Sequence, residues 1–144
     1  MDGAHVLLRP MDAARPICDM DALKLERWLT RLIAGITILT GAIQLIWPAG
    51  LLPLLGVEVS AATAQLFGTV GVFMMLFGGA VLHAQARPQA LSVVLLWAAL
   101  QKIAASLLVG WGTRRGVFAP LALLVAGFDF ASGLLFLDLR RRGG

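Results

Sequence analysis

The chain has 144 residues, of which 59% are apolar and 14% are charged; it has no tyrosine and a formal net charge of +4. This composition leaves too little polar surface to cover a water-soluble domain of that size, which argues against a soluble enzyme or regulator. The basic residues are not interleaved with aromatic ones, so the sequence indicates no nucleic-acid partner. The lipid bilayer is therefore the expected partner.

Residues 1–27 precede the first long apolar stretch. They contain four aspartates among Arg and Lys residues, and they lack both apolar periodicity and the apolar core of a signal peptide. We interpret this segment as a mobile cytosolic N-terminal tail. Met1, Met11 and Met20 each precede an aspartate, and each is a candidate start of translation.

Four apolar stretches follow, each long enough to cross a bilayer as a helix. A hydrocarbon core about 30 Å thick needs roughly 20 residues at 1.5 Å per residue. The segment "WPAGLLPLLG" after the first stretch contains two prolines, and we interpret it as a broken turn in the outer interface, with a re-entrant gate as the alternative. The predicted fold is all-α, an antiparallel four-transmembrane-helix bundle over residues 28–140. The expected spans are about 28–48, 61–84, 89–111 and 117–137.

Gln44 and Gln65 lie near the facing ends of the first two spans. On adjacent antiparallel helices they would share a depth, and we expect their side chains to form a hydrogen bond that supports packing, with contact to a ligand as the alternative. Both spans also carry small residues at steps of three and four, the pattern of closely packed membrane helices. Those residues are Ala34, Thr37 and Gly41 in the first span and Gly68, Gly71 and Gly78 in the second.

Lys102 and Asp129 interrupt the apolar pattern of the third and fourth spans. Counted from a predicted connection at 112–116, they lie about 15 and 19 Å deep on neighbouring antiparallel helices. Each charge would cost about 2.5–3.5 kcal/mol at the centre of a span, so leaving both in lipid is unfavourable. We therefore expect the two side chains to face inward and to form a buried pair.

Two interpretations of this pair stay open. In the first it is structural, and hydrogen bonds from Gln101, Ser106 or Ser132 help to tie the two helices in register. In the second it is a proton relay or a binding residue, because ionisable groups inside membranes commonly have such functions. The sequence contains no catalytic set of residues, metal-ligand cluster or phosphate-binding motif, so we expect no catalytic residue, no metal and no cofactor.

Basic residues are distributed unequally between the two sides of the predicted bundle. Nine Lys and Arg residues lie on the side of the termini and the second connection, whereas the opposite side has only Arg114 and Arg115. The positive-inside rule then places both termini in the cytoplasm. The expected location is the bacterial inner membrane.

Four short spans, the broken turn, and "LLPLLG" leading into a glycine-rich second span give residues 28–140 a pattern that resembles small bacterial membrane proteins of the DoxX-like kind. This resemblance implies a setting in quinone-linked sulfur oxidation or a membrane redox complex. The family's acidic residue near the start of the second span is absent here, where Gln65 stands. The resemblance therefore assigns no site residues.

From these observations we predict a non-enzymatic accessory or assembly subunit held together by the Lys102–Asp129 pair. It would form a homodimer or join a larger membrane complex through small-residue faces such as Gly127 and Ala131. The alternatives are a proton-coupled small-solute transporter that acts as a dimer, and a quinone-associated redox subunit.

Overall fold

The computed structural model describes the backbone of residues 15–142 and the side chains of residues 24–142. It contains four long helices, α1 (Arg15–Ile46), α3 (Ala61–Gln85), α4 (Pro88–Arg114) and α5 (Ala122–Arg142). The short helix α2 (Pro48–Leu51) and the 3-10 turn η1 (Pro53–Leu55) follow α1, and residues 15–142 contain no strand. All four long helices include a stretch long and apolar enough to cross a membrane. The predicted all-α fold with four membrane-length helices is therefore confirmed.

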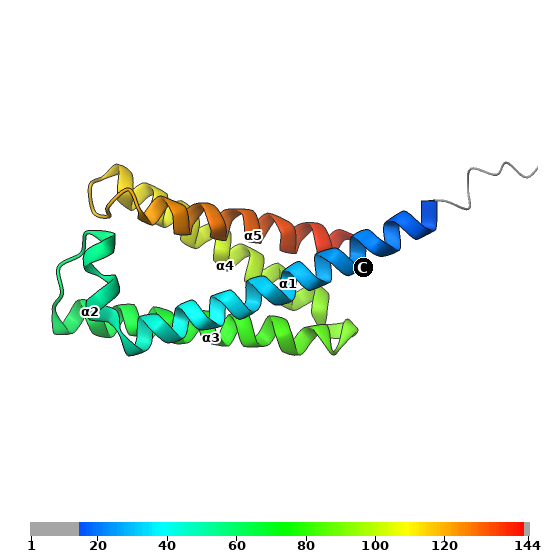
Figure 1. Cartoon of the computed structure of the whole chain (residues 1–144), viewed down its shortest axis with the longest axis horizontal. Helices are drawn as coiled ribbons and strands as arrows, with labels where there is room; N and C mark the ends of the chain where they lie inside the picture. The colour runs from blue at the N-terminus through cyan, green and yellow to red at the C-terminus, as the bar shows by residue number, and fades with distance from the viewer. Residues whose placement is uncertain (1–14, 143–144) are drawn as a thin grey trace, which may run out of the picture.

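The four long helices form two antiparallel hairpins, α1 with α3 and α4 with α5, which lie against each other (Figure 1). The described ends of the chain and the α3–α4 connection lie at one end of the bundle, called here the terminal end. The segment α2–η1 and the α4–α5 connection lie at the opposite end, the turn end. In Figure 1 the two hairpins approach each other at the terminal end and diverge toward the turn end.

The broken turn at the turn end follows from its prolines and one glycine. Pro48 and Pro53 each lack an N–H group and begin α2 and η1, while Gly56 ends η1 in the left-handed region with a φ of 75°. The backbone N–H of Ala119 donates to the carbonyl of Leu55 at 2.8 Å. The broken turn is thereby attached to the α4–α5 connection, across the divergence of the hairpins.

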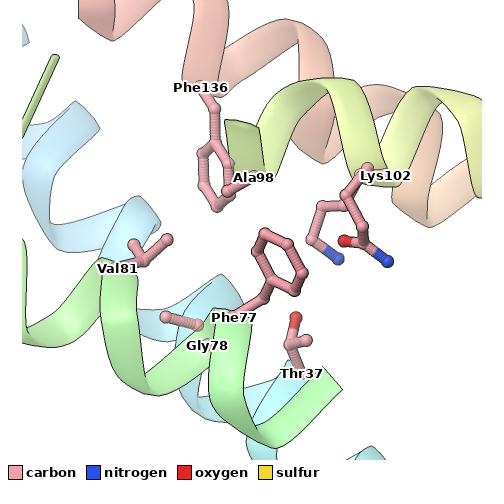
Figure 2. Close-up of a pocket in the computed structure, with 9 residues that line it drawn as sticks. Thr37, Phe77, Gly78, Val81, Ala98, Lys102 and Phe136 are labelled. Carbon is pink, nitrogen blue, oxygen red and sulfur yellow. The ribbon is translucent and has the colours of Figure 1, made fainter. Parts of the chain in front are cut away.

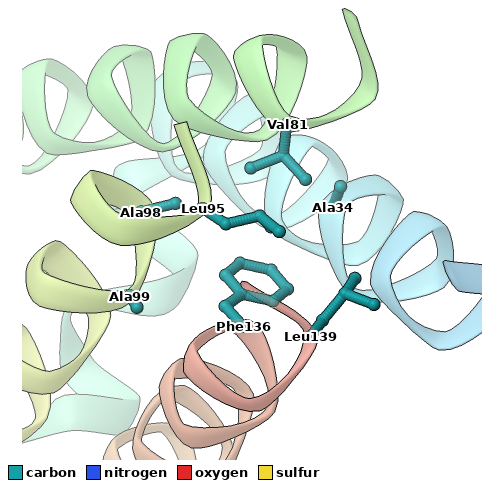
Figure 3. Close-up of a cluster of buried hydrophobic side chains, with 7 residues drawn as sticks. All are labelled: Ala34, Val81, Leu95, Ala98, Ala99, Phe136 and Leu139. Carbon is teal, nitrogen blue, oxygen red and sulfur yellow. The ribbon is translucent and has the colours of Figure 1, made fainter. Parts of the chain in front are cut away.

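The apolar core lies near the terminal end, where side chains from all four long helices converge (Figure 3). Its largest member, Phe136, is only 1% exposed. In lipid the attraction between helices comes mainly from close packing, so a ring this enclosed joins the two hairpins. The core consists of Ala34, Val81, Leu95, Ala98, Ala99, Phe136 and Leu139.

Glycines allow close approach inside each hairpin. A Cβ atom added at Gly78 would lie 2.7 Å from Ile38 Cγ1 and 2.9 Å from the Ala34 carbonyl oxygen, so α1 leaves no room for a side chain there. In the other hairpin, a Cβ at Gly133 would lie 2.8 Å from Ile103 Cγ1. The small residues thus act as contact points between membrane helices, as their spacing predicts.

Charged groups link the helices at the terminal end. Arg142, at the end of α5, forms two ion pairs: its Nη1 atom lies 2.9 Å from Glu26 Oε1 on α1, and its Nη2 atom lies 2.8 Å from Asp138 Oδ2. In addition, Arg31 Nε donates to Gln85 Oε1 at 2.7 Å and connects α1 with the end of α3. The terminal end is therefore held by polar contacts as well as by the apolar core.

Two predicted boundaries differ from the structure. The helix α1 begins at Arg15, so residues 15–27 are helical where we expected a tail, and residues 1–14 lie outside the described part. Hydropathy marks where apolar residues begin, whereas Lys, Glu and Arg continue a helix well beyond that point. The last helix begins at Ala122 instead of 117, because Pro120 disfavours helical backbone in the residue before it.

Candidate functional site

The structure brings Lys102 and Asp129 together between α4 and α5. Lys102 Nζ donates to Asp129 Oδ1 at 2.5 Å, and the two side chains are 5% and 14% exposed. Lys102 Nζ also lies 5.5 Å from the centre of the Phe128 ring, a cation–π distance. The lysine is therefore enclosed, with its charge balanced by one carboxylate and one aromatic face.

Small residues next to the pair set the spacing of the two helices. Ala98 and Ala99, one turn before Lys102, are 2% and 0% exposed. A Cβ added at Gly133, one turn after Asp129, would lie 3.2 Å from the Ala99 carbonyl oxygen. Because the helices approach so closely here, a short carboxylate on α5 can meet a lysine on α4.

The three predicted supporting residues do not hydrogen-bond to the pair. Ser106 Oγ donates to the Ile103 carbonyl at 2.8 Å, and Ser132 Oγ donates to the Phe128 carbonyl at 2.7 Å. Hydroxyls in helices commonly return to a carbonyl three or four residues earlier in this way. Gln101 is half-buried and lines a small cavity beside the lysine. The prediction that these side chains hydrogen-bond to the pair is therefore wrong, although Ser106 and Ser132 are buried near the pair.

Gln44 and Gln65 do not meet, so that prediction is also wrong. Gln44 is 9% exposed, and its Oε1 atom has no hydrogen-bond partner in the described part of the chain, whereas Gln65 is exposed. A Cβ at Gly71 would lie 3.0 Å from Gln44 Cβ, which puts Gln44 level with Gly71. Gln65 is six residues earlier, about 9 Å further along α3. We predicted the depth of each glutamine from its distance in sequence to the connection between α1 and α3. This fails because α3 extends further toward the turn end than α1 does.

Two cavities flank the ion pair. The small cavity, on the side of Lys102, has a volume of about 10 Å³, close to the minimum for one water molecule. Figure 2 shows Lys102, Thr37 and Phe77 around this space, with the core residues Val81 and Phe136 at its other side.

The second cavity, called here the cleft, lies between α1, α3 and α5 and has a volume of about 240 Å³. Asp129 lines the cleft, and Thr37 lines both cavities, so the pair and this threonine stand between the two spaces. The walls of the cleft are Ile36, Thr37, Thr40, Met74, Leu124, Val125, Phe128 and Asp129.

The sequence reasoning missed the cleft. Its hydroxyls come from Thr37 and Thr40, three residues apart on α1, and this spacing is the one signal that could have indicated a polar strip. The divergence of the hairpins has no local signature, because it depends on which end of the bundle holds the large core side chains. Comparisons with protein-family models, with curated proteins and with solved structures found no match to this chain.

Proposed function

We propose that this small multi-pass membrane protein is a non-enzymatic accessory or assembly subunit. Its Lys102–Asp129 pair fixes α5 against α4, and the outer face of α5 then binds a second copy or a larger membrane complex. The enrichment of Lys and Arg at the terminal end supports an orientation with both termini in the cytoplasm, in a bacterial inner membrane. A reporter active only outside the cytoplasm, fused after Gly144, should then be inactive.

One observation carries the assembly proposal. Gly127 and Ala131 are exposed on α5, and a Cβ at Gly127 would meet nothing within 4 Å. Both residues stand two positions from Asp129, about 200° around the helix, so the rotation that turns the carboxylate inward turns them outward. A small residue repeated after four positions lets the backbone of another helix approach closely. The inward glycines of the same protein already make such contacts, as at Gly133.

Gly127→Leu tests this proposal. Native mass spectrometry of the protein released from membranes in lipid nanodiscs should detect a dimer or larger complex for the wild type and a monomer for the variant. Gly35→Leu is the matched control, because Gly35 is also exposed with nothing within 4 Å but lies on α1. A monomeric wild type, or assembly that survives Gly127→Leu and fails with Gly35→Leu, would contradict the proposed role of α5.

A further inference from the structure

The geometry points to the cleft between α1, α3 and α5 as a binding site for a small, neutral, hydroxyl-bearing molecule with an apolar body. The hydroxyl would donate a hydrogen bond to Asp129 Oδ2 and accept one from Thr40. The cleft is open to the surroundings of the bundle, since Ile36, Leu124 and Phe128 on its walls are 39%, 71% and 40% exposed. This inference does not rest on the assembly proposal.

The size of the cleft selects the class of molecule. Its volume of about 240 Å³ exceeds the roughly 150 Å³ of a cavity that holds benzene, and it falls below the roughly 300 Å³ at which sites for drug-sized ligands begin. A single ring with a short substituent fits this range. Most of the wall is apolar and comes from Ile36, Met74, Leu124 and Val125, so the body of the ligand should be apolar too.

Two polar groups on opposite walls have hydrogen-bonding capacity left. Lys102 bonds to Oδ1 of Asp129, and within the described residues Oδ2 accepts no hydrogen bond. Thr37 uses its hydroxyl on the Ile33 carbonyl at 2.8 Å, whereas Thr40 makes no side-chain hydrogen bond in the described part. Neither oxygen is among the buried, unpaired side-chain atoms, so both are accessible from the cleft, and in a bilayer little water is present to bond them. A ligand hydroxyl can serve both groups, because one oxygen donates and accepts.

The charge balance of the site favours a neutral ligand. Asp129 already has a full counter-charge, since Lys102 Nζ is 2.5 Å from its Oδ1 and is itself 5% exposed. An ammonium ligand would place a second cation beside the buried lysine without a second carboxylate, which is unfavourable at low dielectric. An uncharged hydroxyl adds a hydrogen bond and leaves the pair intact.

The test uses the full chain in lipid nanodiscs and two matched probes, 4-fluorophenol and fluorobenzene, observed by ¹⁹F NMR. Empty nanodiscs provide the correction for partition into lipid. We expect saturable binding of 4-fluorophenol, and binding of fluorobenzene at least about tenfold weaker, because it lacks the donor. Equal binding of both probes would overturn the proposal and identify an apolar cleft suited to an acyl chain. Tighter binding of 4-fluorobenzylammonium would overturn it in favour of a cation site.

Variants locate the binding in the cleft without changing the ion pair. Val125→Trp fills the cleft and should abolish binding, whereas Leu123→Trp, also exposed on α5 but outside the cleft, should not. Thr40→Val keeps the shape of the side chain, removes the hydroxyl and should weaken 4-fluorophenol about two- to tenfold, the range of one neutral hydrogen bond. Binding that is unchanged in both Val125→Trp and Thr40→Val would show that the probe binds elsewhere.

Discussion

The two halves of this bundle are built from the same four helices and pack very differently. At the terminal end Phe136 is 1% exposed among residues of all four helices, and Arg142 connects α1 with α5. Toward the turn end the hairpins diverge around a cleft of about 240 Å³, and a backbone hydrogen bond from Ala119 to Leu55 crosses between them. Close packing between the two hairpins is therefore concentrated at one end, and space for a ligand is left between them at the other.

The comparison shows how the placement of a few large side chains decides where a membrane bundle closes. Phe136 and Phe128 lie on the same helix, but the first fills the core while the second is 40% exposed on the wall of the cleft. Helices in lipid are held by contact and not by exclusion of water, so regions without interlocking side chains separate easily. The ion pair Lys102–Asp129 lies at the boundary between the closed and the open half.

The largest expected effect comes from separating the ion pair. Lys102→Leu or Asp129→Leu alone leaves one uncompensated charge inside the bundle and should lower the free energy of unfolding by about 3–5 kcal/mol. The double variant removes both charges and should recover most of that loss. Reversible unfolding in mixed micelles measures all three variants.

A double variant that loses the sum of the two single effects would show that the residues are not coupled. Recovery of stability in the double variant would establish the pair as a tie between α4 and α5. A transport assay on the same stable double variant then separates a structural role from a proton relay, because a relay would stay inactive after stability has returned.

The residues of this pair could be predicted from sequence for a simple physical reason. Two opposite charges at similar depth on consecutive helices have few favourable arrangements in lipid besides meeting each other. The connection between α4 and α5 runs over 115–121, whereas we predicted 112–116. The predicted pairing survives this error of several residues because the lysine side chain is long and flexible. The predicted pairing of Gln44 with Gln65 was less strongly determined, since leaving neutral amides unpaired costs less free energy than leaving charges unpaired.

The cleft could not be predicted, because no local pattern encodes it. Its walls combine Thr40 of α1, Met74 of α3 and Val125 of α5, three residues that only the crossing of the helices brings together. Hydropathy alone also cannot distinguish Trp97, which is 61% exposed, from the buried Leu95 two residues earlier. Both distinctions depend on the rotation of a helix whose faces are almost equally apolar.

The second expected effect tests the unequal packing itself. Phe136→Ala should lower the free energy of unfolding by about 2–4 kcal/mol, since it leaves a cavity among four helices; the roughly 3–5 kcal/mol of water-soluble cores is reduced because lipid is as apolar as the core. Phe128→Ala, the same change eight residues earlier on the same helix, should cost under about 1 kcal/mol, because the ring is 40% exposed. Unfolding of both variants under the same micelle conditions provides the comparison. Equal losses would mean that the turn end is packed as tightly as the terminal end.

The smallest expected effect concerns the charged contacts at the terminal end. Arg142 and Asp138 are 50% and 44% exposed, so water reaches the cation and screens much of this interaction, although Glu26 is only 12% exposed. Arg142→Gln should therefore lower the free energy of unfolding by only about 0.2–1 kcal/mol, and the difference should shrink in about 1 M salt, where screening acts within roughly 3 Å.

Arg141→Gln is the matched control, since it removes the neighbouring exposed charge, which makes no ion pair in the described part of the chain. If Arg141→Gln were equally destabilising, the basic cluster would act through the lipid surface. The closure of the terminal end would then rest on Phe136 and its apolar neighbours alone.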